Sequence, residues 1–201
     1  VTDLARFLQG AGADITGVGT RVLHIRGREL LMGTQHAVCP DRITAATVLC
    51  AVAGCGGEVL LTNTCNAHLA EVLRILRRAG CMVSASGDAA PLMAAGLLRA
   101  QGERRVTDTI FENRFACAEG FLRLGASVNV CGRTLHVHGM DLLNGADVEA
   151  PDLRGGAALV IAALQAQGST RVMGAEHISR GYEDIAALLA PLGARITRSW
   201  G

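Results

Sequence analysis

An internal repeat constrains the fold of this chain more than any other feature of its sequence. Four segments combine a helix-period apolar stripe, a Gly-Ala or Gly-Cys pair and a short strand-like stretch, at residues 3–15, 68–83, 112–128 and 181–196. One face of each helix is therefore expected to be buried. A glycine favours the left-handed conformation that ends a helix, and each segment carries one, namely Gly12, Gly80, Gly125 and Gly193.

Alanine-rich helices alternate with these amphipathic segments. They are predicted over residues 44–55, 90–101 and 153–167, and β-branched strands follow them at 58–62, 104–109 and 170–173. The closing glycine of each alanine-rich helix lies 24, 23 or 25 residues before the closing glycine of the next amphipathic helix. Such regular spacing predicts repeated α-β-α-β units. Because the alanine-rich helices are apolar nearly all round, we expect them at the domain centre, with the amphipathic helices outside.

The second half of each repeat runs from the closing glycine of an amphipathic helix to that of the next alanine-rich helix, and it is shorter in one copy. It measures 44 residues from Gly12 to Gly56 and 43 from Gly125 to Gly168, but only 22 from Gly80 to Gly102. The long versions hold two strands each, at 14–16 and 22–26 and at 127–130 and 134–138, whereas the short one has only residues 84–87. One copy is therefore predicted to lack about 21 residues, which is about the length of a β-hairpin. Alternating helices and strands predict a layered α/β domain.

Composition excludes several function classes. Hydrophobic residues make up 50% and charged residues 18% of the chain, which is typical of a folded protein. All nineteen basic residues are arginine, so no lysine is present to form a Schiff base or a P-loop. A net charge of +1 and 3% aromatic residues argue against a nucleic-acid partner. Apolar stretches such as residues 157–164 fall short of the roughly 20 residues of a membrane span.

The cysteines and histidines indicate neither a disulfide framework nor a metal site. Seven cysteines are an odd number and none forms a CxxC pair, so we expect reduced thiols and a cytoplasmic location. They also lack the neighbour pattern of a thiolate nucleophile. His24, His136 and His138 alternate with apolar residues, which favours solvent-facing strand positions. No ligand spacing predicts a metal.

Four strings place an arginine at a predicted helix start. They are PDRI, IFENRF, DLRGGAALV and HISRGYE, and they contain Arg42, Arg114, Arg154 and Arg180. The helix dipole favours negative charge at this end, so a cation is unexpected there. An anion facing both the guanidinium and the backbone N–H groups would explain the arrangement. Phosphate and carboxylate are the anions that such donors bind well.

Helix capping is the alternative explanation of these strings. Asp41, Asn113 and Asp152 are ordinary N-cap residues, and each nearby arginine would then pair with an acid. A cap requires the acid but not the arginine, so recurrence of the arginine favours an anion site. The glycines at 54–57 and 155–156 match no phosphate-binding motif, and close helix crossing explains them better.

The same four strings resemble those of UDP-N-acetylglucosamine 1-carboxyvinyltransferases, a family of enolpyruvyl transferases that begins peptidoglycan synthesis. The match runs in order along essentially the whole chain, and the sister family that makes enolpyruvylshikimate phosphate is not expected to show FENRF or HISRGYE. The resemblance implies an inverse αβ barrel of βαβαββ units, three in each of two domains. Residues 1–40 would then end the first domain, and residues 41–201 would form the second, with a shortened copy near 84–88.

The resemblance also implies roles for particular residues. Arg180 matches an arginine on the phosphoenolpyruvate side of the site, and counting back from FENRF places Asp88 at the general base, although the string Ser-Gly-Asp replaces the family's Pro-Thr-Asp. Ile110 matches a backbone position that contacts the sugar nucleotide. The remaining substrate-binding positions are expected at Arg42, Arg114, Asp152 and Arg154.

The implied reaction is addition and elimination without a cofactor or metal. The base removes the proton of the sugar 3-hydroxyl, which attacks C2 of phosphoenolpyruvate while C3 is protonated, and phosphate then leaves. The family's cysteine-bearing loop and its lysine-asparagine pair belong to an N-terminal half that this sequence does not contain. The leading hypothesis is therefore a C-terminal portion that is inactive alone. The alternatives are a non-catalytic paralogue that binds a sugar nucleotide or a partner subunit, and a structural α/β domain without a ligand.

Overall fold

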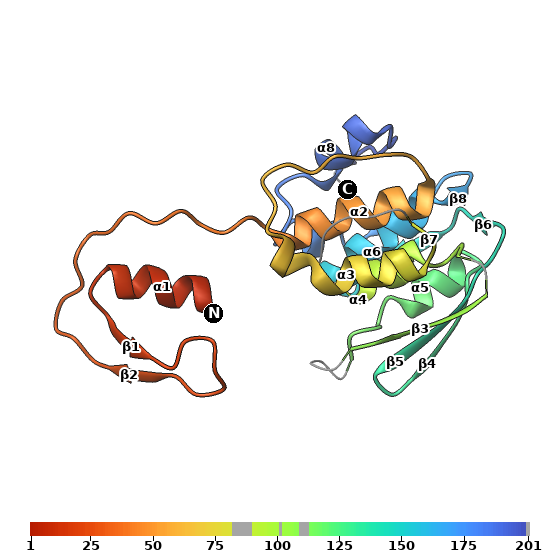
Figure 1. Cartoon of the computed structure of the whole chain (residues 1–201). Helices are drawn as coiled ribbons and strands as arrows, with labels where there is room; N and C mark the ends of the chain where they lie inside the picture. Colours follow the sequence, from red (N-terminus) through yellow and green to blue (C-terminus); the bar gives the residue numbers. More distant parts are fainter. Residues whose placement is uncertain (82–89, 101, 109–112, 200–201) are drawn as a thin grey trace. The chain divides into compact units, whose positions relative to one another are not determined.

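The chain divides into two compact units, Val1–Pro40 (unit 1) and Asp41–Gly201 (unit 2). The computed structural model in Figure 1 describes residues 1–81, 90–100, 102–108 and 113–199. The expected boundary between two enolpyruvyl transferase domains at residue 40, and the assignment of unit 1 to the end of the first, stay predictions.

Unit 1 is a helix facing a two-stranded hairpin (Figure 1). Its elements are α1 (Thr2–Gly10), β1 (Asp14–Thr16) and β2 (His24–Arg26). The two strands are antiparallel, and the predicted strand at 22–26 forms over its last three residues. Ala5, Ala11 and Ile15 are buried. The extended segment that follows returns along the helix, where Asp3 contacts the His36 ring at 3.1 Å.

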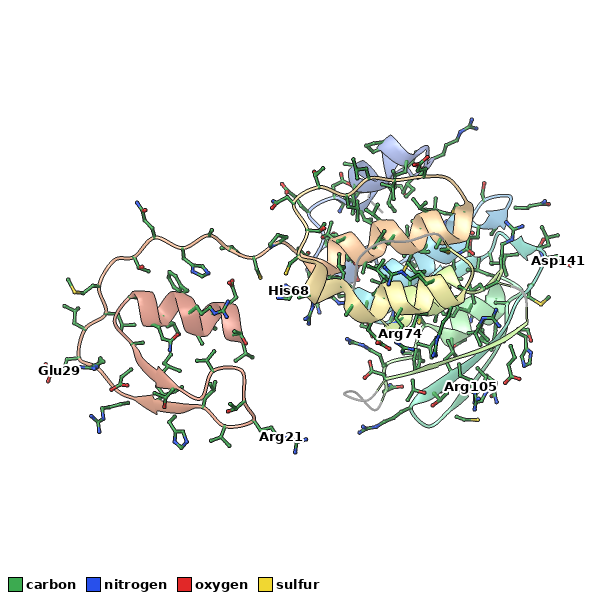
Figure 2. All side chains as sticks on the ribbon, viewed as in Figure 1. Arg21, Glu29, His68, Arg74, Arg105 and Asp141 are labelled. Carbon is green, nitrogen blue, oxygen red and sulfur yellow. The ribbon has the colours of Figure 1, made fainter. Side chains whose placement is uncertain are left out.

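Helices make up most of the core of unit 2. They are α2 (Arg42–Cys55), α3 (Asn66–Arg78), α4 (Ala90–Gly96), α5 (Ala118–Arg123), α6 (Leu153–Leu164), α7 (Ala175–Ile178), α8 (Ile185–Leu189) and the 3-10 helix η1 (Ala190–Leu192). Every residue from Gly155 to Ala162 is buried, and α6 packs against both α2 and α4. On amphipathic α3, Leu69 and Leu73 face the core while Arg74 lies at the surface (Figure 2). The predicted arrangement of central and outer helices is confirmed.

Short strands flank these helices in three small sheets of unit 2. The strands are β3 (Glu103–Thr107), β4 (Ser127–Cys131), β5 (Thr134–His138), β6 (Leu143–Asn144), β7 (Asp147–Glu149), β8 (Ala166–Gln167) and β9 (Arg171–Met173). They pair as antiparallel β3-β5-β4, parallel β6-β8 and parallel β7-β9. Leu135 and Val137 point into the core, and His136 and His138 take the opposite face of β5 as predicted. The fold is mixed α/β, and the strands of the described residues close no barrel.

The glycines predicted to end the amphipathic helices all adopt the left-handed conformation. Their φ angles are 95° at Gly12, 92° at Gly80, 84° at Gly125 and 90° at Gly193. A side chain is strained there, so glycine is the residue that lets each helix stop and the chain turn into the next segment. The repeat therefore reflects a recurring backbone requirement.

Some predicted elements are shorter or absent. The expected helix at 90–101 ends at Gly96, and residues 113–117 form turns, so the helix expected in the third amphipathic segment begins only at Ala118. The strand expected at 58–62 does not form, and Leu60 is 87% exposed. A strand needs a partner for its backbone groups, and this is the copy predicted to have lost its hairpin. Residues 84–87 lie outside the described residues.

Candidate functional site

Aspartates cap the first turns of α2 and α6. Asp41 Oδ1 accepts from the Ile43 N–H at 2.8 Å, and Asp152 Oδ1 accepts from the N–H groups of Arg154 and Gly155 at 2.8 and 2.7 Å. Two of the three predicted caps, Asp41 and Asp152, therefore form. Asn113 is not a helix cap, because residues 113–117 form turns and the N-cap of α5 is Cys117. Within the described residues, however, no ion pair joins Arg42 or Arg154 to a carboxylate. The capping explanation accounts for the acids and leaves the arginines unexplained.

Both arginines lie at a helix start, as expected, but at positions that differ by one residue. Arg42 is the first residue of α2 and is exposed, whereas Arg154 is the second residue of α6 and is half-buried. One residue corresponds to a rotation of about 100° around an α-helix. The two guanidinium groups therefore leave their helices in different directions.

Arg154 lies beside the buried Tyr182. The tyrosine is 5% exposed, and its hydroxyl is 2.6 Å from Thr47 Oγ1 of α2. Burial raises the pKa of Tyr182 and the charge of Asp41 adds to this, while the Thr47 hydroxyl and the charge of Arg154 act in the opposite direction. The phenol thus stays neutral at physiological pH.

The turn that carries Arg180 packs on the start of α6. A Cβ atom at Gly181 would lie 2.6 Å from Leu153 Cδ2, so only glycine allows the turn to approach the helix this closely. Arg180 is exposed and lies between α7 and α8 rather than at a helix start, contrary to expectation. The loop 179–184 replaces the first turn of the helix predicted from residue 181. Arg180 therefore neighbours the α6 start through Gly181.

Arg114 approaches the same region from the turn before α5. Its Nε lies 3.3 Å from Oδ2 of Asp108, whose side chain is only 8% exposed. Cys117 connects this turn to α6, because a Cβ at Gly155 would be 3.3 Å from Cys117 Cβ. Burial and the charge of Asp152 raise the pKa of Cys117 to about 12, with Arg114 acting against them. Arg114 and Asp152 thus both lie close enough to one buried thiol to influence its pKa.

These contacts bring three of the predicted site residues together at the N-terminal end of α6, namely Arg114, Asp152 and Arg154. Arg180 lies on the adjacent turn, and Arg42 begins the neighbouring helix α2. The predicted Asp88 and Ile110 lie outside the described residues. Among the described residues, Arg42, Arg154 and Arg180 form no ion pair.

Sequence analysis missed Thr47, Asp108 and Tyr182. Tyr182 could have been predicted from the sequence, because it is the single tyrosine of the chain and belongs to the HISRGYE string. Thr47 lies 135 residues away in sequence and lines a helix face without any motif. Asp108 ends the β3 segment and is marked only by being an acid after a β-branched strand.

Other features of the described residues do not form a second chemical centre. No group of three or more His, Cys, Asp or Glu in the described part of the chain gathers closely enough to hold a metal ion. No helix among the described residues is long and apolar enough to span a membrane. Burial and the neighbouring Cys81 raise the pKa of Cys50 to about 12, so this thiol stays protonated.

A hollow opens at the C-terminal ends of α2, α3 and α4. Its lining includes Gly56 after α2, Ala79 after α3, and Arg99 and Arg104 near α4 and β3. Helix C-terminal ends carry partial negative charge, so arginines there complement the dipoles. The hollow therefore lies at helix C-terminal ends, whereas the arginines of the candidate site lie around the N-terminal end of α6.

The chain belongs to the family described as EPSP synthase (3-phosphoshikimate 1-carboxyvinyltransferase), whose sequence model matches residues 1–90 and 86–189. It is 39% identical to UDP-N-acetylglucosamine 1-carboxyvinyltransferase 2 of Caldanaerobacter subterraneus, over 98% of this chain and 54% of that protein. It is 37% identical to UDP-N-acetylglucosamine 1-carboxyvinyltransferase of Clostridium botulinum, over the same shares. The chain thus spans about half the length of the curated relatives it matches.

Solved structures agree with this family assignment. The enolpyruvyl transferase NikO from Streptomyces tendae superposes with a TM-score of 0.74 at 27% identity, over 97% of this chain and 53% of its own. EPSP synthase from Acinetobacter baumannii gives a TM-score of 0.73 at 18% identity, over 93% and 53%, and shares the fold. The expected enolpyruvyl transferase fold is confirmed.

The comparisons also bear on the shortened copy. The match to the Caldanaerobacter protein extends over 225 residues, more than the 201 of this chain, so that protein carries residues absent here. The two segments that match the family model meet at residues 86–90. Both observations agree with a deletion beside the expected strand at 84–87.

Proposed function

We propose that this chain supplies the C-terminal part of an enzyme that transfers the enolpyruvyl group of phosphoenolpyruvate to the 3-hydroxyl of UDP-N-acetylglucosamine. The observation that carries the proposal is the gathering of arginines without carboxylate partners around the start of α6. The names of the curated relatives support this choice of substrates. The acceptor is therefore a sugar nucleotide rather than shikimate 3-phosphate.

The arginines hold charge throughout the proposed reaction. Phosphoenolpyruvate brings a phosphate and a carboxylate, and guanidinium groups bind both with paired N–H donors. Arg180 is assigned to the phosphoenolpyruvate side, with Arg42, Arg114 and Arg154 binding the anionic groups of the two substrates. Preorganised donors stabilise charge that develops during addition and elimination without having to reorganise as water would.

The remaining roles come from the family resemblance. Asp88 is assigned as the base that takes the proton of the sugar hydroxyl, and the Ile110 backbone contacts the sugar nucleotide. Asp152 orients the first turn of α6 through its two hydrogen bonds to backbone N–H groups. We further assign the protein to peptidoglycan synthesis and thus to cell-wall growth, cell shape and division, in the cytoplasm. No cofactor or metal takes part.

The chain is proposed to be inactive alone, because the N-terminal half would complete the cleft. The test joins this chain in one polypeptide to the N-terminal half of the Caldanaerobacter relative, and this polypeptide is called the joined protein below. Phosphate release from phosphoenolpyruvate and UDP-N-acetylglucosamine is expected from the joined protein and not from the chain alone. Turnover by the chain alone would contradict the proposal that both halves are needed for activity. An inactive joined protein would contradict enolpyruvyl transfer.

A non-catalytic paralogue is the second candidate, favoured by the shortened copy and by Ser-Gly-Asp at residues 86–88. Calorimetry separates the two. A paralogue would bind UDP-N-acetylglucosamine in the joined protein without releasing phosphate, and restoring Pro-Thr at residues 86–87 would not produce release. In the enzyme, Asp88→Asn abolishes release and leaves sugar-nucleotide binding in place.

A further inference from the structure

Asp108 is a buried acid whose position is fixed by a sheet. It directly follows β3 and lies on the same side of the chain as Val106, which is 3% exposed, and its own side chain is 8% exposed. Its backbone N–H donates to the Arg133 carbonyl oxygen at 2.9 Å, which continues the pairing of β3 with β5. The carboxylate is therefore attached to a rigid element and largely removed from water.

Arg114 is the cation that lies beside this carboxylate. Its Nε is 3.3 Å from Oδ2 of Asp108, and the arginine side chain is 27% exposed. An ionised carboxylate is costly to remove from water unless a positive charge accompanies it, so the pairing favours this arrangement of both side chains. The next residue, Phe115, is 4% exposed and anchors the backbone of the turn in the core. Arg114 is thus held at its backbone by Phe115 and at its guanidinium by Asp108.

The internal repeat shows that the backbone unit does not require this ion pair. Residues 57–80 and 102–125 align without a gap at a constant spacing of 45, from GEVLLTNT and GERRVTDT to the closing glycine of each. At the two positions of the ion pair, the segment 57–80 has Asn63 and Leu69, and Leu69 is 2% exposed in the core. The acid is therefore present in the segment that has the arginine and absent from the segment that packs a leucine there.

A fixed guanidinium edge has a consequence for binding. The guanidinium is planar and carries five N–H donors in a rigid fork, so holding the Nε edge sets the directions of all the others. Donors that are already oriented need not reorganise when an anion binds or when its charge changes during a reaction. Asp108 thus converts a flexible side chain at the candidate site into a preorganised one.

We propose that Asp108 is a positioning residue, which holds the Arg114 guanidinium in the orientation that binds an anionic group of the substrates. This inference rests on the proposed function of the site. Asp108 touches no substrate itself and acts through Arg114.

The test is a double-mutant cycle in the joined protein, in which phosphate release gives kcat and the KM of each substrate. Asp108→Asn keeps the size of the side chain and removes its charge. It should reduce kcat/KM at least about tenfold, because displacing a substrate-positioning group by about 1 Å can cost about 100-fold. Arg114→Gln should reduce kcat/KM further. The substrate whose KM rises most should be the same in both variants.

The double variant separates action through the arginine from independent action. Asp108→Asn combined with Arg114→Gln should be no less active than Arg114→Gln alone, because the acid then has no guanidinium to hold. The same cycle is run with Asp108→Glu, which keeps the charge and moves it by one methylene. Its loss should be smaller than that of Asp108→Asn and should also vanish beside Arg114→Gln. This second cycle decides the question if Asp108→Asn does not fold.

Glu119 provides the matched control, because it pairs with Arg123 at 3.0 Å on α5 with both side chains exposed. Glu119→Gln should leave kcat/KM and the melting temperature unchanged, since exposed ion pairs contribute little.

Two results would overturn the positioning role while the proposed function stands. One is a double variant in which the two losses multiply. The other is an Asp108→Asn variant with unchanged kcat and KM, whether or not its melting temperature falls, because the pair would then be structural only. If the unaltered joined protein releases no phosphate, the proposed function fails and the inference fails with it.

Discussion

The first turns of α2 and α6 have the same kind of cap but place their arginines differently. Both are capped by an aspartate and both carry an arginine, yet Arg42 is exposed to solvent while Arg154 is half-buried. The cause is a shift of one position along the helix, which places Ile43 where α6 has Arg154. A repeated backbone unit thus leaves one arginine in solvent and half-buries the other, with the difference made by a single residue of register.

The largest expected effect separates the two arginines by activity. In the joined protein, Arg154→Ala should reduce phosphate release about 100-fold, the size seen when one preorganised donor is removed. Arg42→Ala should reduce it less than about tenfold, because solvent and salt screen an exposed charge. Melting temperatures of both variants should stay near that of the unaltered protein. Equal losses of activity would show that the two helix starts contribute alike.

Arg180→Ala extends the same comparison to the adjacent turn. Arg180 is assigned to the phosphoenolpyruvate side of the site, so its removal should impair turnover by about tenfold or more. Stability should change little, because the side chain is exposed and forms no ion pair among the described residues. Phosphate release and thermal unfolding are measured together. A loss of thermal stability in step with the loss of activity would instead identify a structural ion pair.

The fourth residues of α2 and α6 differ, and substituting each of them tests how tightly the helix is packed at that position. In α6 this residue is Gly156, where a Cβ would lie 2.7 Å from Ile178 Cγ1 and 2.9 Å from Ala150 Cβ, whereas α2 has Ala45. Gly156→Ala should lower the free energy of unfolding by about 1–3 kcal/mol through overpacking. Ala45→Gly should cost about 1 kcal/mol, the difference in helix propensity. Denaturant unfolding measures both, and a stabilising Gly156→Ala would contradict the tight contact.

Sequence patterns predicted the backbone frame better than the site. The closing glycines could be placed because each left-handed turn needs one particular residue type, and the caps because an aspartate acts on N–H groups two or three residues away. The contact between Tyr182 and Thr47 spans 135 residues and depends on how α2 and α6 pack. No local pattern encodes it, and the one-residue offset between Arg42 and Arg154 depends on where each helix begins.

The same reasoning explains the predicted strand at 58–62 that is absent. β-branched residues indicate a strand only if another strand is available to pair with it. The long copies provide such hairpins, as in β4 and β5, and the copy predicted to be shortened does not. Whether a segment with β propensity forms a strand thus depends on whether a distant segment is present to pair with it.

The smallest expected effect is a pH dependence shared by both helices. Cys50 of α2 and Cys117 beside α6 each have a pKa raised to about 12, with burial as the main cause. The unfolded chain ionises these thiols near pH 8.5, so folding stability is fully present below that pH and is lost as the pH rises toward 12. Between pH 8 and 9.5 each thiol should reduce the free energy of unfolding by about 1 kcal/mol.

Replacing one thiol removes its share of this slope, so Cys117→Ala and Cys50→Ala should each flatten the stability profile between pH 8 and 9.5 by a similar amount. Cys131 is exposed, so Cys131→Ala is the matched control and should leave the slope unchanged. The profile is measured by denaturant unfolding at closely spaced pH values. A flatter slope for Cys117→Ala alone would mean that the charge of Asp152, rather than burial, governs the thiol beside α6, and would make the two helix starts electrostatically unlike.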